Sequence, residues 1–161
     1  MVLPYFAGER MPIKDPKAKG LMLGLTLAHT RNHIIRACIE GIGYALAQSL
    51  DIIRDMGLEI KEVTAIGGGT KNPGWMQIMS DITGIPHKIY QHNNGASYGD
   101  AMLAALGTGS ATVADIKKWN SVKEIIRPNE ENHAFYSQKA QLFKELYLNN
   151  KDAMHQIRST L

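Results

Sequence analysis

A run of three glycines between a short apolar segment and a proline constrains the fold of this chain more than any other feature. The run is Ile66-Gly67-Gly68-Gly69-Thr70-Lys71-Asn72-Pro73. Asn72 followed by Pro73 is typical of a helix N-cap and the first helical position. The pattern therefore predicts a strand over 62–66, a tight glycine turn, and a helix that begins near residue 73.

The glycine turn is a candidate nucleotide site. Without Cβ atoms, Gly68 and Gly69 let a flat or anionic group approach the backbone, and the helix start offers N–H donors. The same residues also suit a strand-to-helix turn that binds nothing, because an isolated glycine motif is weak evidence. Neither G-x-x-x-x-G-K-[ST] nor G-x-G-x-x-G occurs in this run, so it carries neither the P-loop nor the dinucleotide fingerprint.

Composition narrows the class of protein. The 161 residues are 44% hydrophobic and 20% charged with a net charge of +3, as in an ordinary globular domain. The lysines are dispersed and no apolar run reaches the ~20 residues that span a bilayer, so we expect no nucleic-acid or membrane partner. The single cysteine, Cys38, fits a reducing compartment and lies among isoleucines. We therefore expect a cytoplasmic protein with Cys38 buried and inert.

Apolar periodicity predicts a long helix over Arg31–Met56, with Thr30 as its N-cap and Gly57 just beyond its end. The apolar positions recur every three or four residues and form one face: Ile34, Cys38, Ile42, Leu46, Leu50 and Ile53. Gly41 and Gly43 lie inside this helix, where each costs about 1 kcal/mol relative to alanine. Their presence predicts that another backbone packs closely against them.

The rest of the chain reads as α/β with few strands. We expect a helix over 73–83, a strand over His87–Tyr90, a small-residue helix over 95–106 that can lie close to a sheet, a mixed connector over 119–128, and a last helix over 130–157. The strand–helix–strand order predicts a parallel pair with a right-handed crossover. Residues 1–30 read as loop, with a brief extended stretch at Val2–Phe6. Two strands are too few for an independent sheet, so either further strands escape the pattern or the chain is part of a larger fold.

Several motifs together resemble the FGGY carbohydrate kinases, and within that family they are similar to those of xylulokinases. They run in order from about Leu3 to Tyr147: Pro4–Pro12, Asp15–Gly20, Gly24-Leu25, His29–Arg31, Arg36-Ala37 with Glu40-Gly41, Gly67–Gly69 with Trp75, Gln77 and Asp81, and Gly95-Ala96 with Gly99 and Ala104-Ala105. Their collinearity carries the resemblance. Two positions depart from the family pattern: Asn93-Asn94 replaces a commoner acidic residue, and Asp100 replaces a small one. Asp100 either disturbs packing of its helix or faces solvent.

The resemblance implies a fold and an origin for the chain. FGGY kinases have two domains of the actin-like ATPase (ribonuclease H-like) fold, with sugar and ATP in the cleft between them. Residues 1–161 resemble the later part of the C-terminal, ATP-binding domain, with short parallel strands, flanking helices and a long C-terminal helix. The sugar-binding domain, with its aspartate base, and the strands that carry a Gly-Thr phosphate turn have no counterpart in the sequence.

The resemblance also implies site residues. Gly68 and Gly69 are expected against adenine and ribose, with Thr70 beside them. Asn72 aligns with a contact to the adenine edge, although capping alone is the alternative. Two other positions of the motif are expected to have supporting roles: Trp75 packs, and Asp81 makes a contact on or behind the helix surface and binds no metal. No catalytic residue is expected within the chain.

The expected function is the adenosine-binding portion of an ATP-dependent kinase that phosphorylates a sugar hydroxyl, of xylulose or a related sugar. The six histidines lack zinc-ligand spacing, so we expect Mg²⁺ to arrive with ATP, held by phosphates. The chain alone is expected to be inactive and to form a homo-oligomer. The alternative is a non-catalytic nucleotide-binding or interaction module.

Overall fold

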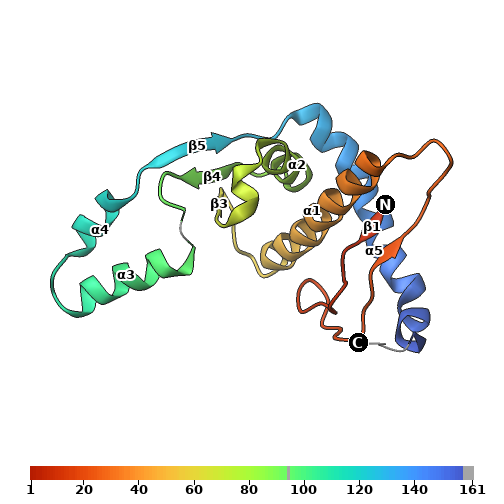
Figure 1. Ribbon diagram of the computed structural model, residues 1–161, viewed down its shortest axis with the longest axis horizontal. Helices are drawn as coiled ribbons and strands as arrows, with labels where there is room; N and C mark the ends of the chain where they lie inside the picture. Colours follow the sequence, from red (N-terminus) through yellow and green to blue (C-terminus); the bar gives the residue numbers. More distant parts are fainter. Residues whose placement is uncertain (94, 158–161) are drawn as a thin grey trace.

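The computed structural model describes residues 1–93 and 95–157. Its elements are β1 (Val2–Leu3), β2 (Leu21–Met22), α1 (Arg31–Asp55), β3 (Val63–Ala65), the 3₁₀ turn η1 (Gly68–Lys71), α2 (Pro73–Thr83), β4 (His87–Tyr90), α3 (Ala96–Gly107), α4 (Val113–Trp119), β5 (Val122–Ile126) and α5 (Glu130–Gln156). Figure 1 shows α1, α2 and α5 gathered on one side of the molecule, with α3 and α4 at its opposite end. Over the described residues, no helix combines the length and apolar character that crossing a membrane requires.

The main sheet has three strands in the order β3-β4-β5. β3 and β4 are parallel, with Val63 opposite His87, which confirms the predicted pair; α2 forms the crossover. β5 runs antiparallel to β4. The prediction of a mixed connector over 119–128 was wrong, because Lys123 and Glu124 interrupt the apolar signal of an edge strand whose stability comes from its ladder with β4.

The opening thirty residues are not all loop. β1 and β2 form a short antiparallel pair, with Val2 opposite Met22, and β1 packs against α1. Gly41 in α1 permits this packing: a Cβ atom there would lie 2.3 Å from the carbonyl oxygen of Val2. The predicted close backbone contact at Gly41 is therefore confirmed. At Gly43 the close neighbour is instead a side chain, Ile82 of α2, at 2.6 Å from the same kind of added atom.

The buried face of α1 is rotated from the predicted one. Tyr44, Ala45 and Leu50 are buried together with the two glycines, whereas Ile42 is 40% exposed. Cys38 is only half-buried, so the expectation of a buried thiol was wrong. The physical reason is that close packing along the glycines buries the face of α1 that contacts β1 and α2. A pattern of apolar residues does not predict this, because glycines add little to it.

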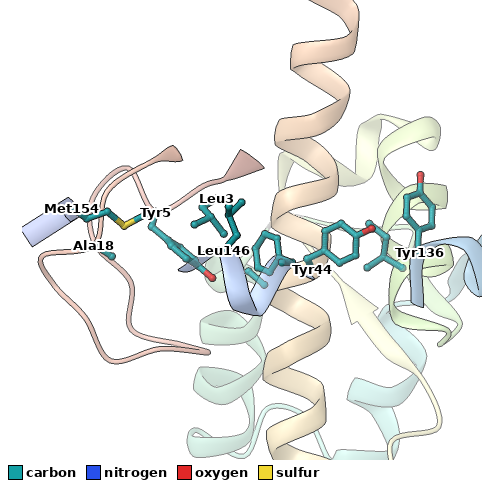
Figure 2. Packing of buried hydrophobic residues seen from close by; sticks show 10 residues of the cluster. Leu3, Tyr5, Ala18, Tyr44, Tyr136, Leu146 and Met154 are labelled. Atoms are coloured by element: carbon teal, nitrogen blue, oxygen red, sulfur yellow. The ribbon is translucent and has the colours of Figure 1, made fainter. Parts of the chain in front are cut away.

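Aromatic side chains from three segments form the core. The ring of Tyr44 in α1 stacks on Phe143 in α5, with centroids 5.2 Å apart, and Tyr5 meets Phe143 edge-on at 6.3 Å. In Figure 2 the labelled residues form a row: Met154, Ala18, Tyr5, Leu3, Leu146, Tyr44 and Tyr136. The N-terminal segment, α1 and α5 therefore share one hydrophobic cluster, which supports the face of α1 that packs on α2.

A buried carboxylate joins the N-terminal loop to the end of α5. Asp15 is 7% exposed, and its Oδ2 accepts hydrogen bonds from the Tyr147 hydroxyl at 2.8 Å and from His155 Nε2 at 2.7 Å. Its Oδ1 accepts from the backbone N–H of Lys17. Burial alone would raise the pKa of Asp15, but the hydrogen bonds from His155, Tyr147 and Lys17 outweigh it and lower the pKa from 3.8 to about 2.

The small-residue helix α3 does not pack against the sheet. No described residue of α3 is buried, Leu103 is 68% exposed, and Asp100 faces solvent. The Tyr98 hydroxyl donates to the backbone oxygen of Trp119, which ties α3 to α4. The expected close approach to a sheet is therefore absent from the described residues, and the side chains of α3 are exposed or half-buried. Figure 1 shows α3 at the end of the molecule away from α1 and α5.

Candidate functional site

The glycine turn lies between the end of β3 and the start of α2. Gly67 adopts φ = 92°, a conformation that favours glycine, and η1 follows before the chain enters α2 at Pro73. The predicted tight glycine turn takes the form of the 3₁₀ turn η1. β3 is also shorter than the predicted 62–66.

The backbone of the turn is bare on its outer side. A Cβ atom at Gly68 would meet nothing within 4 Å, and one at Gly69 would meet only the ring of Trp75, at 3.9 Å. This places the Trp75 ring beside Gly69, on the half-buried side of the turn. The glycines therefore leave room for a ligand to approach the backbone, with only the Trp75 ring near Gly69, and this suits a purine base or a ribose.

Asn72 caps α2. Its Oδ1 accepts a hydrogen bond from the backbone N–H of Trp75 at 3.1 Å, so the capping part of the expectation is confirmed. The side chain is exposed, and its amide nitrogen is a donor that capping by Oδ1 does not use. The geometry thus fits a residue that caps with its oxygen and offers its nitrogen to a ligand.

Thr70 faces into the turn. Its hydroxyl donates to the carbonyl oxygen of Gly67 at 2.7 Å and accepts from Nδ2 of Asn93. Oδ1 of Asn93 accepts from the backbone N–H of Gly67 at 3.0 Å. No role for Asn93 followed from the sequence beyond its departure from the family pattern. The parallel pairing of β3 and β4 brings it beside the glycines. Asn94 lies outside the described residues.

The turn is an open face and not a closed pocket. Two grooves occur elsewhere, one of about 390 Å³ where β2, α1 and α5 meet and one of about 590 Å³ between α1 and α5. Neither is lined by residues of the glycine turn. A ligand on Gly68 and Gly69 would therefore be covered on one side only by this chain.

Comparison with known proteins decides the family. Residues 1–108 match the model described as FGGY family of carbohydrate kinases, C-terminal domain. The chain belongs to the FGGY family. It is 38% identical over 150 residues to a xylulose kinase of Staphylococcus epidermidis, an alignment that covers 92% of this chain and 30% of that protein. A glycerol kinase of Shewanella oneidensis is 34% identical over 160 residues, covering 98% of this chain and 31% of that protein.

Solved structures of FGGY kinases share the fold. The ligand-bound xylulose kinase of Lactobacillus acidophilus matches with a TM-score of 0.83 and 26% identity, over 94% of this chain and 31% of that one. The xylulose kinase of Rhodospirillum rubrum matches with a TM-score of 0.81 and 30% identity, over 97% of this chain and 31% of that one. The predicted fold class, an α/β part of the actin-like ATPase fold, is confirmed. The chain spans about a third of the length of these relatives.

Another position of the FGGY motif, Asp81, is a structural residue in this chain. It is 3% exposed, which corrects the part of the expectation that placed it on the helix surface. Its Oδ1 accepts from Gln77 Nε2 at 2.7 Å and from the backbone N–H of Asn129 at 2.8 Å, and its Oδ2 accepts from Asn132 Nδ2 at 2.9 Å. Asp81 therefore fastens α2 to the start of α5 and so fixes the helix whose first turn faces the glycines.

Metal-ligating side chains are not clustered in the part of the chain that the structure describes: no group of three His, Cys, Asp or Glu side chains is positioned to hold an ion there. The ammonium of Lys88, a residue of the central strand β4, pairs with Glu62, and this hydrogen bond raises the pKa of Lys88. The turn carries one charged side chain, that of the exposed Lys71, together with backbone N–H groups and amide and hydroxyl side chains.

Proposed function

We propose that this chain is the adenosine-binding portion of the C-terminal domain of an ATP-dependent carbohydrate kinase. The observation that carries the proposal is the bare backbone at Gly68 and Gly69 in a chain of the FGGY family. The parent enzyme would transfer a phosphoryl group to the hydroxyl of xylulose or a related sugar, since xylulose kinases predominate among the similar proteins quoted above. Its single cysteine, unpaired within the chain, supports a cytoplasmic location.

In this proposal the two glycines, Thr70 and Asn72 have different roles in binding the nucleoside. The backbone of Gly68 and Gly69 receives the flat faces of adenine and ribose, because any side chain there would occupy their place. Thr70 holds the shape of the turn from inside through its bond to Gly67. Asn72 donates from its amide nitrogen to a ring nitrogen of adenine while its oxygen caps α2.

ATP would supply the phosphoryl group, with Mg²⁺ held by its phosphates and not by a cage of side chains. The residues described here suit the nucleoside and not the phosphates: they offer an open glycine backbone and an amide donor, without a glycine-lysine cradle. We therefore assign residues 1–161 to the later part of the ATP-binding domain. The sugar contacts and the base that accepts the sugar proton are assigned to the other domain of the kinase.

Adenosine and ATP are expected to bind this chain with similar, weak affinity, and Gly69→Val is expected to abolish binding of both. A valine side chain would fill the space that the base needs, while its Cβ atom meets only Trp75 at 3.9 Å, so the fold should tolerate it. Isothermal titration or ligand-observed NMR measures the affinity, and circular dichroism reports helix content.

Gly107→Val is the matched control, because Gly107 also has open space around it and lies in α3 outside the turn. It should bind adenosine like the wild type. Much tighter binding of ATP than of adenosine would reveal a phosphate cradle within these residues and contradict the assignment. Unchanged binding by Gly69→Val would contradict the placement of the base.

We also propose that the chain forms a homo-oligomer through apolar side chains around the start of α1. Leu23, Leu25 and Leu27 are all exposed, Leu27 completely, and Ile35 is exposed nearby in the sequence. Sedimentation at micromolar concentration should show a dimer or larger species, because exposed apolar patches of this kind associate. The double variant Leu25→Glu/Leu27→Glu should be monomeric, whereas Val113→Glu, at an exposed position in α4, should not change the sedimentation coefficient. A monomeric wild type would refute the proposal.

A further inference from the structure

Asn93 closes a ring of hydrogen bonds around the glycine turn. The backbone N–H of Gly67 donates to Asn93 Oδ1 at 3.0 Å, Asn93 Nδ2 donates to the Thr70 hydroxyl, and this hydroxyl donates to the Gly67 carbonyl at 2.7 Å. Each donor in the ring meets one acceptor. The ring therefore connects the loop after β4 to both ends of the segment that contains Gly68 and Gly69.

The ring fixes the part of the turn that has the greatest conformational freedom. Gly67 has φ = 92°, and glycine in this region moves between several backbone conformations at little cost. The N–H of Gly67 donates to Asn93 and the carbonyl of Gly67 accepts from Thr70, so both peptide groups of Gly67 are held by hydrogen bonds. Loss of the ring would leave the backbone at Gly68 and Gly69 free to rotate away from the orientation that faces a ligand.

The amide at position 93 satisfies both requirements of the ring. Gly67 N–H requires an acceptor, and the Thr70 hydroxyl, which already donates to Gly67, requires a donor. An ionised carboxylate accepts but cannot donate, so it would compete for the Thr70 proton and break the bond to the Gly67 carbonyl. The asparagine at 93 is therefore matched to the threonine at 70.

We propose that Asn93 is the positioning residue of the adenosine site: through Gly67 and Thr70 it holds the glycine backbone in the orientation that receives the nucleoside. This inference rests on the proposed function, since it concerns the same ligand. Asn93 itself need not contact adenosine. The effect of Asn93 on adenosine binding should therefore depend on the Thr70 hydroxyl. A residue that only stabilises the loop would not show this dependence.

The test compares adenosine affinity among variants of the chain. Asn93→Ala is expected to weaken adenosine binding about tenfold, because two hydrogen bonds of the ring are lost. Asn93→Asp should weaken it by a smaller factor, because the acceptor for Gly67 remains. In a Thr70→Val background, Asn93→Asp should cause little further loss, because the hydroxyl that distinguishes amide from carboxylate is gone. The ¹⁵N–¹H NMR signal of Gly67 reports directly whether its N–H remains bonded.

Asn120→Ala is the matched control. Asn120 makes two hydrogen bonds to the same loop, accepting from His92 N–H at 2.9 Å and donating to the His92 carbonyl at 2.8 Å, without touching the turn. The Asn120→Ala variant should bind adenosine with an affinity within about twofold of the wild type, even if Asn120→Ala and Asn93→Ala lower the melting temperature equally. Equal loss of binding in Asn120→Ala and Asn93→Ala, or wild-type binding by Asn93→Ala, would overturn the inference alone. Failure of the wild type to bind adenosine would overturn the proposed function, and this inference with it.

Discussion

No phosphorylated sugar is expected when the purified 161-residue chain is incubated with ATP, Mg²⁺ and a panel of pentuloses, hexonates and polyols. The general base of the proposed kinase is assigned to its other domain, outside residues 1–161, and a general base contributes about 10²–10⁴-fold to the rate. Loss of the contacts that position the phosphates adds to this deficit. A coupled assay for ADP, with chromatography for the sugar phosphate, measures the result.

A full-length xylulose kinase relative provides the positive control in the same assay. A background phosphatase or ATPase would release ADP without forming sugar phosphate, so the chromatographic measurement decides the outcome. Turnover of any sugar at ordinary kinase rates, which are about 1–100 s⁻¹, would show that the chain contains its own base and phosphate cradle. Such a result would refute the proposal that the other domain of the kinase supplies the base and the sugar contacts.

Asp15→Ala is expected to lower the free energy of unfolding by about 1–3 kcal/mol, because the substitution leaves three donors, among them the half-buried Tyr147 hydroxyl, without their acceptor. These donors are the Tyr147 hydroxyl, His155 Nε2 and the backbone N–H of Lys17. Asp51→Ala is the control: it removes an exposed pair with Arg54 and should cost less than about 1 kcal/mol. Urea unfolding followed by circular dichroism measures both.

The stabilising effect of Asp15 should also depend on pH. Its pKa is lowered to about 2 in the folded state from 3.8, so the contribution is present above about pH 4 and is lost as the pH falls from there towards 2. The difference in unfolding free energy between the wild type and Asp15→Asn should therefore shrink over this range. A difference that stays constant from pH 7 to pH 2.5 would mean that the charge on Asp15 contributes nothing.

Local patterns predicted α1, α2, α3 and α5 and located the candidate site, whereas α4 (Val113–Trp119) was not predicted. Thr30 and Gly57 mark the ends of α1, and Asn72 and Pro73 mark the start of α2, because capping depends on residues that are neighbours in sequence. The parallel pair β3–β4 followed from the strand–helix–strand order. The glycine run located the bare backbone at Gly68 and Gly69, since the absence of Cβ atoms is written in the sequence itself.

Long-range contacts were beyond the reach of these patterns. β5 is a strand because it forms hydrogen bonds with β4. Its exposed Lys123 and Glu124 interrupt the apolar pattern by which a strand is predicted from sequence. Asp15 and His155 are 140 positions apart, and Asn93 is 23 positions from Thr70, yet each pair is in contact.

The sequence by itself determined where the backbone is bare, where α1, α2 and α5 begin and end, and to which family the chain belongs. The tertiary structure alone decided which face of α1 is buried, that α3 stays exposed, and that Asn93 completes the glycine turn. The physical reason is that caps and turns are fixed by interactions within a few residues. A buried face or a closing hydrogen bond depends instead on which distant segment the fold places beside it.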